Sequence, residues 1–91
     1  MSTDSLTADK QLCRDFRTQC DSFKSRMEKG RKLLMDGIHA AHAGWQDSGY
    51  ENVLKMAFTI AQDVESIEKM VSGQIIPYVD ETISLLDSAP Y

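Results

Sequence analysis

A seven-residue apolar repeat runs through the first half of the chain and narrows how that half can fold. Its members are Leu6, Cys13, Cys20, Met27, Leu34 and Ala41. Residues spaced by seven fall on one face of an α-helix, two turns apart. Because the first proline of the chain is Pro77, nothing interrupts a helix before that point. The sequence therefore predicts one long amphipathic helix over about residues 5–43.

The second half carries a similar repeat, with a second apolar lane beside the first. The first lane holds Tyr50, Ala57, Val64, Val71, Tyr78 and Leu85, and the neighbouring lane holds Val53, Ile60 and Ile67. This spacing predicts a second helix over about residues 48–88. We expect a kink near Pro77, because a proline ring clashes with the carbonyl four residues earlier, here that of Gly73.

Glycine and a capping pattern mark a turn between the two repeats. Gly44 and Gly49 interrupt the apolar spacing, and Ser48 followed by Glu51 matches the capping box that starts a helix. We expect the turn at Trp45 to Gly49. The chain is therefore predicted to be a single all-α domain over residues 1–91, folded as an antiparallel two-helix hairpin.

An antiparallel hairpin folded at this turn places residues opposite each other whose numbers add to 90 or 91. The rule pairs Cys20 with Val71 and sets the small residues Gly30 and Gly37 opposite bulky ones. We therefore expect both glycines to lie in the contact between the two helices.

A lone pair of helices rarely buries enough apolar surface to fold stably, which indicates a binding partner. The second helix carries an apolar lane outside the predicted contact between the helices. It consists of Leu54, Phe58, Ala61, Ile76, Val79, Ile83 and Leu86. We expect this lane to be the interface through which a second hairpin completes a four-helix bundle. The alternative is that these residues are ordinary scattered surface apolars.

The charge of the chain excludes some partners and indicates how its halves meet. The net charge of −4 argues against nucleic acid, which needs a basic surface. Residues 1–44 hold eight Lys and Arg against six Asp and Glu, whereas residues 45–91 hold two against eight. The basic residues that recur every seven positions in the first half are expected near acids such as Glu68 and Asp80. We expect neither a cleavable signal peptide nor a stretch apolar enough to span a membrane.

The chain offers little for catalysis or cofactor binding. His39 and His42, with Asp36 before them, are a weak candidate metal site, because no further ligand cluster completes the set. Cys13 and Cys20 lie on the apolar repeat and are expected to be buried free thiols. No phosphate loop or nucleophile arrangement is present. We therefore expect no enzymatic activity, no cofactor and no bound metal.

The only tryptophan stands at the predicted turn, where it has two interpretations. Trp45 either folds back over the helix ends or offers an exposed aromatic anchor to another protein. With its surroundings it resembles the WXG superfamily of small helical hairpins handled by type VII secretion systems. The family motif is Trp-any-Gly, and here the residues are Trp45, Gln46 and Asp47, with Gly49 and Tyr50 following.

The resemblance implies a non-enzymatic type VII secretion substrate or targeting partner, active as one half of a helical bundle dimer. The implied partners are a second copy, a related hairpin or the helical targeting domain of a toxin, together with the secretion machinery. The implied location is the cytoplasm of a Gram-positive bacterium before export, then the outside or the cell surface. The usual export signal, Tyr followed four places later by Asp or Glu, is not met at Tyr78, where Thr82 follows. The alternative is a cytosolic helical adaptor or chaperone-like subunit unrelated to secretion.

Overall fold

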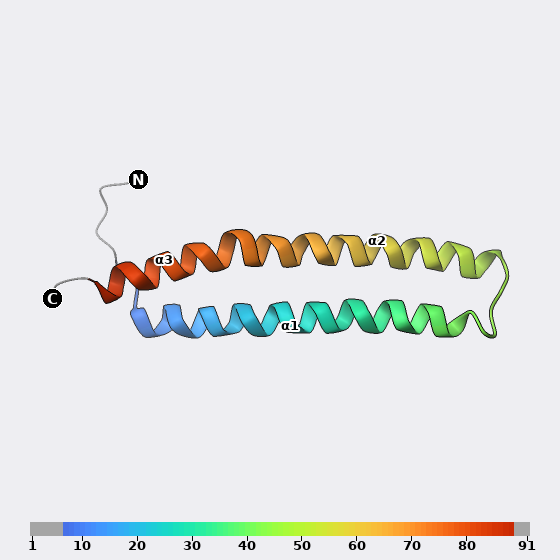
Figure 1. Cartoon of the computed structure of the whole chain (residues 1–91), viewed down its shortest axis with the longest axis horizontal. Coiled ribbons are helices and arrows are strands. Elements are labelled where there is room, and N and C mark those ends of the chain that lie inside the picture. Colours follow the sequence, from blue (N-terminus) through green and yellow to red (C-terminus); the bar gives the residue numbers. More distant parts are fainter. Residues whose placement is uncertain (1–6, 89–91) are drawn as a thin grey trace.

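The computed structural model describes residues 7–88 and shows two antiparallel helical arms joined by one turn (Figure 1). The first arm is the single helix α1 (Lys10–Ala41). The second arm consists of α2 (Ser48–Met70), the π-helical segment η1 (Val71–Ile75) and α3 (Ile76–Asp87). Within the described residues no strand occurs, so the prediction of an all-α hairpin is confirmed.

Helix α1 is shorter than predicted at both ends. It begins at Lys10 because the side chain of Asp9 accepts a hydrogen bond from the backbone N–H of Leu12, at 2.9 Å, and so caps the helix. It ends at Ala41. Beyond it, hydrogen bonds between residues three apart, such as that from the N–H of Gly44 to the carbonyl of Ala41, tighten the chain into the turn. Residues 5 and 6 of the predicted helix lie outside the described part of the chain.

The residue that caps α2 is Asp47, which corrects the predicted capping box of Ser48 and Glu51. The Asp47 carboxylate accepts a hydrogen bond from the backbone N–H of Tyr50, and Ser48 is already the first helical residue. Aspartate is as good a cap as serine, and here its carboxylate also binds the indole of Trp45. The turn is consequently residues 42–47, and Gly49 and Tyr50 belong to the first turn of α2.

The break expected near Pro77 takes the form of the π-helical segment η1. At its end the N–H of Ile76 bonds to the carbonyl of Val71, five residues back rather than four. Proline has no N–H to donate and its ring needs room near the carbonyl of Gly73, which the wider π turn provides. The extra residue rotates everything after it by about 100° around the helix axis.

This rotation exchanges the two apolar lanes of α3. Tyr78 and Leu85, predicted to face α1, are 72% and 54% exposed, whereas Ile76, predicted to be part of the outer lane, is only 8% exposed. Val79, Ile83 and Leu86 of the predicted outer lane are partly buried. The predicted assignment of the two lanes is therefore wrong beyond η1, because it assumed an unbroken α-helix.

Two small clusters of buried side chains hold the arms together. One contains Cys20, Val71 and Ile76, and the other contains Ile38, Tyr50 and Ala57 near the turn. The predicted pairing of Cys20 with Val71 is therefore confirmed. The chain measures 66 × 22 × 14 Å. The shortest dimension, 14 Å, is the thickness of a single layer of helices.

The predicted role of two glycines in this packing is wrong. A Cβ atom added at Gly30 or Gly37 would meet no atom within 4 Å outside its own helix backbone. Neither residue is thus needed for the close approach of the two arms.

Candidate functional site: an apolar groove between the two arms

The two sides of the hairpin differ in chemistry, and one side is bridged by ion pairs. Arg17 Nε lies 2.7 Å from Asp80 Oδ1, and Arg31 Nε lies 3.1 Å from Glu68 Oε1. These bridges confirm the predicted approach of basic α1 residues to Asp80 and Glu68. Near the chain ends, Lys10 and Arg14 both bind Asp87, at 3.1 Å and 2.9 Å. Below, "the ion-paired side" means the side formed by these residues.

The ion pairs at the end of the hairpin shift the pKa of the carboxylate that they share. The hydrogen bond from Lys10 and the nearby charge of Arg14 hold the pKa of Asp87 below its ordinary value. The Lys10–Asp87 ion pair is well exposed, however, and exposed ion pairs stabilise a fold only slightly. The ion-paired side therefore helps to set the register of the two arms more than their stability.

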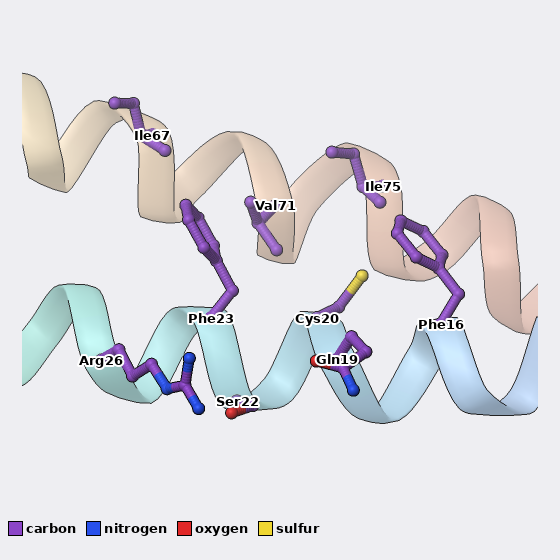
Figure 2. Close-up of a pocket in the computed structure, with 9 residues that line it drawn as sticks. All are labelled: Phe16, Gln19, Cys20, Ser22, Phe23, Arg26, Ile67, Val71 and Ile75. Atoms are coloured by element: carbon purple, nitrogen blue, oxygen red, sulfur yellow. The ribbon is translucent and has the colours of Figure 1, made fainter.

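The opposite side of the hairpin is open and apolar. A groove of about 520 Å³ runs between the arms there, lined by Phe16, Gln19, Cys20, Ser22, Phe23, Arg26, Ile67, Val71 and Ile75. Figure 2 shows Phe16 and Phe23 reaching from α1 toward the second arm, with Cys20 between them. Arg17 follows Phe16 by one residue, or about 100° around α1, so their side chains leave the helix on opposite sides of the contact between the arms.

The residues around the groove are apolar but remain half exposed. Phe16 is 50% exposed, Phe23 42% and Ile67 41%. A second hollow, lined in part by Leu12 and Tyr78, shares Phe16 with the groove and continues it toward the chain ends. We call "the open face" the exposed apolar residues on this side, namely Leu12, Phe16, Phe23, Ile67, Ile75 and Tyr78.

The predicted interface lane does not coincide with the open face. Leu54 packs against the cluster near the turn, and Ile76 is buried within the hairpin. Phe58 is exposed, but with the partly buried Ala61 it lines a shallow hollow beside Arg31, on the ion-paired side. With Val79, Ile83 and Leu86 partly buried, the expectation of one continuous exposed lane is wrong.

The sequence analysis did not separate the open face from the contact between the helices. Phe16, Phe23 and Ile67 belong to apolar lanes adjacent to the central one, and two helices in contact cover only part of so wide a stripe. The width of the stripe was the available signal. A strip two lanes wide on both arms exceeds what one partner helix can bury.

The structure brings together the predicted residues of the turn. The indole Nε1 of Trp45 donates a hydrogen bond of 2.7 Å to Asp47 Oδ1, and the rings of Trp45 and Tyr50 meet edge to face at 5.8 Å. A Cβ atom at Gly49 would lie 3.0 Å from Asp47 Oδ1 and 3.4 Å from the indole, so only glycine fits there without a shift. Of the two interpretations of Trp45, this packing agrees with an indole folded back over the helix ends.

The same contacts explain the electrostatics of the turn. The backbone N–H of Tyr50 and then the indole of Trp45 donate to the Asp47 carboxylate and lower its pKa. His42 stacks on the ring of Tyr50 at 4.7 Å between centroids. The turn is therefore a closed network of side chains centred on Tyr50.

The weak candidates for chemistry gain no support from the geometry. Across residues 7–88, His, Cys, Asp and Glu side chains nowhere gather in a group of three that suits a metal, which includes the surroundings of His39 and His42. Cys13 and Cys20 are free thiols, the first partly buried and the second buried. Of the helices described, none combines the length and apolar character needed to cross a membrane.

Searches of protein-family models, curated proteins and solved structures return no match to the chain.

Proposed function

We propose that the chain is a non-enzymatic binding module and that it forms one half of a four-helix bundle through its open face. The observation that carries this proposal is a groove walled by half-exposed phenylalanine and isoleucine side chains. Phe16, Phe23 and Ile67 are each at least 40% exposed, although their burial is favourable by roughly 25 cal/mol per Å². A second layer of helices laid on this face removes them from water.

The cellular role that we propose is that of a type VII secretion substrate or targeting partner. Its support is the hairpin with Trp45 at the turn, which resembles the WXG superfamily in architecture as well as in length. The partner is then a second copy, a related hairpin or a toxin's helical targeting domain. The chain would act with the secretion machinery, cytoplasmic before export and then outside the cell or at the surface of a Gram-positive bacterium.

A cytosolic helical adaptor or chaperone-like subunit is the second candidate. It uses the same open face and needs no export. The observation in its favour is Thr82, which stands where the usual secretion signal beginning at Tyr78 requires an acidic residue.

The binding proposal is tested by measuring the native mass of two purified proteins, the wild type and a variant with a charge in the groove. Phe23→Glu should abolish association, because it buries a charge in the interface. Phe58→Glu is the matched control, since Phe58 is 46% exposed and lies on the ion-paired side, away from the groove. Equal association of both variants, or a wild-type chain that stays monomeric and retains no protein partner, would overturn the proposal.

The cellular role is tested by export. Expressed in a Gram-positive host with an active type VII system, the protein should accumulate in the medium only while the export ATPase is functional. Retention in the cytoplasm together with a bound helical partner would instead favour the adaptor.

A further inference from the structure

We infer that the groove is a binding site for a free fatty acid, with the acyl chain between the rings of Phe16 and Phe23 and the carboxylate at Arg26. The inference goes beyond the proposed bundle, because it names a small-molecule ligand and does not require a protein on the open face. It follows from the floor of the groove, from its polar edge and from the charge of Arg26.

The groove has a narrow apolar floor. Cys20 and Val71 line it although they are only 5% and 6% exposed, so they lie at its bottom. Figure 2 shows the rings of Phe16 and Phe23 on either side of Cys20, both reaching toward the second arm. An α-helix with its side chains is about 10–12 Å across, so a helix laid on this face rests on the ring edges. A linear acyl chain is narrow enough to enter between the rings.

The shape of the groove suits a long unbranched chain. Its volume of about 520 Å³ is that of an ordinary small-molecule site, and the second hollow continues it past Phe16 toward the chain ends. Between Leu12 and Arg26, α1 rises by about 21 Å, at 1.5 Å per residue. An acyl chain that starts at Arg26 can therefore run along both hollows.

One edge of the groove is polar. Gln19, Ser22 and Arg26 line it from α1. Their spacing of three and four residues makes them neighbours on the surface of the helix. Figure 2 shows Ser22 and Arg26 at the edge that lies away from the second arm. The groove is therefore apolar between the arms and polar along α1, which matches a ligand with an apolar body and a polar end.

Arg26 supplies the charge that selects an acid. Among the described residues that line the groove, only Arg26 is charged. Within residues 7–88, Arg14, Arg17 and Arg31 are each held by a carboxylate, whereas Arg26 forms no ion pair. A guanidinium binds a carboxylate through two parallel hydrogen bonds. A fatty acid supplies this carboxylate and the apolar chain in one molecule.

Two amphiphiles with the same chain and opposite charge test the site. Laurate and dodecyltrimethylammonium are titrated into the wild-type protein, each below its micelle concentration, and calorimetry measures their binding. The wild type should bind laurate about tenfold more tightly than the cation, because only laurate is attracted by Arg26. Equal affinity for the two, or no binding of laurate, overturns the inference.

Charge reversal at Arg26 tests the place of the carboxylate. Arg26→Glu should weaken the binding of laurate about tenfold and remove the preference over the cation. Lys24→Glu is the matched control, because it makes the same charge change outside the groove, about 200° around α1 from Arg26. It should keep the preference of the wild type. An equal loss in both variants means that laurate responds only to the total charge of the chain, which overturns the inference.

Removal of one ring tests the place of the acyl chain. Phe23→Ala should weaken the binding of both amphiphiles about fivefold, since it takes away one wall of the groove. Phe58→Ala removes an equally large side chain from the ion-paired side and should change neither affinity. Unchanged binding in Phe23→Ala overturns the site.

The native mass, recorded with and without laurate, separates this inference from the proposed function. A bundle that binds no laurate overturns the fatty-acid site and keeps the bundle. A chain that binds laurate with the expected preference but has no protein partner keeps the fatty-acid site and overturns the bundle. Binding to vesicles of anionic phospholipid without binding to monomeric laurate also overturns the inference, because the ligand is then a membrane surface.

Discussion

The hydroxyl of Tyr50 donates a hydrogen bond of 3.0 Å to the backbone carbonyl of Ile38, linking the start of α2 to the end of α1. Ile38 is one of the last four residues of α1, whose carbonyls lack a partner within the helix. Tyr50 itself is only 3% exposed. A tyrosine at this position therefore fills the cluster near the turn and also satisfies a helix end.

Replacement of Tyr50 by phenylalanine should destabilise the fold while leaving its shape unchanged. The variant keeps the ring but leaves the buried carbonyl of Ile38 without its donor, which costs about 1–3 kcal/mol. Urea unfolding at a fixed protein concentration measures the loss. Tyr78→Phe is the control and should stay within about 0.5 kcal/mol, because that hydroxyl is on an exposed side chain. Equal losses at both sites would deny Tyr50 this role.

The cap of α2 should give the protein a measurable acid sensitivity. The hydrogen bonds from Tyr50 and Trp45 place the pKa of Asp47 in the folded state below the unfolded value of about 3.9. Such a group stabilises the fold above the unfolded pKa, and this contribution is lost as the pH falls through the folded pKa. Asp47→Asn keeps an acceptor and a good cap but cannot titrate.

Thermal melts of these variants measure that sensitivity. Between about pH 7 and pH 3, the melting temperature of Asp47→Asn should fall less than that of the wild type. Asp47→Ala should melt at a lower temperature at every pH, because it lacks the cap altogether. Parallel pH profiles for wild type and Asp47→Asn would show that the carboxylate is not held by these bonds.

The rotation introduced by η1 predicts which residues of α3 matter for stability. Ile76→Ala should cost about 2–4 kcal/mol, because it opens a cavity beside Cys20 and Val71. Leu85→Ala should cost less than about 1 kcal/mol, since that side chain is mostly exposed. Chemical denaturation of the two variants, compared with wild type, checks the order. The reverse order would mean that α3 continues α2 as an unbroken α-helix.

Trp45 is expected to contribute to stability through its packing. Trp45→Ala should lower the free energy of unfolding by about 1–3 kcal/mol, less than for a fully buried tryptophan because the indole is only partly buried. Trp45→Phe should recover part of this loss but not the hydrogen bond to Asp47. If Trp45→Ala keeps wild-type stability and loses a bound partner, the indole is an anchor for another protein instead.

The spacing of apolar and charged residues was enough to predict the hairpin, the site of its turn and the ion pairs of Arg17 and Arg31. These features depend on periodicity, which a helix preserves over many turns. The choice between Asp47 and Ser48 as the cap could not be made from the sequence, because both are good capping residues. It is decided by the carboxylate that binds Trp45 and the Tyr50 amide together.

The lanes of α3 show a second limit of periodicity. Both candidate lanes are apolar there, one through Ile76 and Ile83 and the other through Tyr78 and Leu85. The extra residue in the π-helical turn of η1 decides which lane faces α1. Whether that turn forms depends on how the backbone accommodates Pro77. A local change of this kind alters the role of every later residue without changing the pattern.

The thinness of the hairpin has a consequence for its fate in a cell. Among residues 7–88 no large side chain falls below 2% exposure, because a layer 14 Å thick has no interior out of reach of water. Under the proposed pairing, much of its resistance to proteases comes from association, so it increases with the number of chains synthesised. Dilution should then make unpaired chains easy to degrade, and the protein would persist only where its partner is abundant.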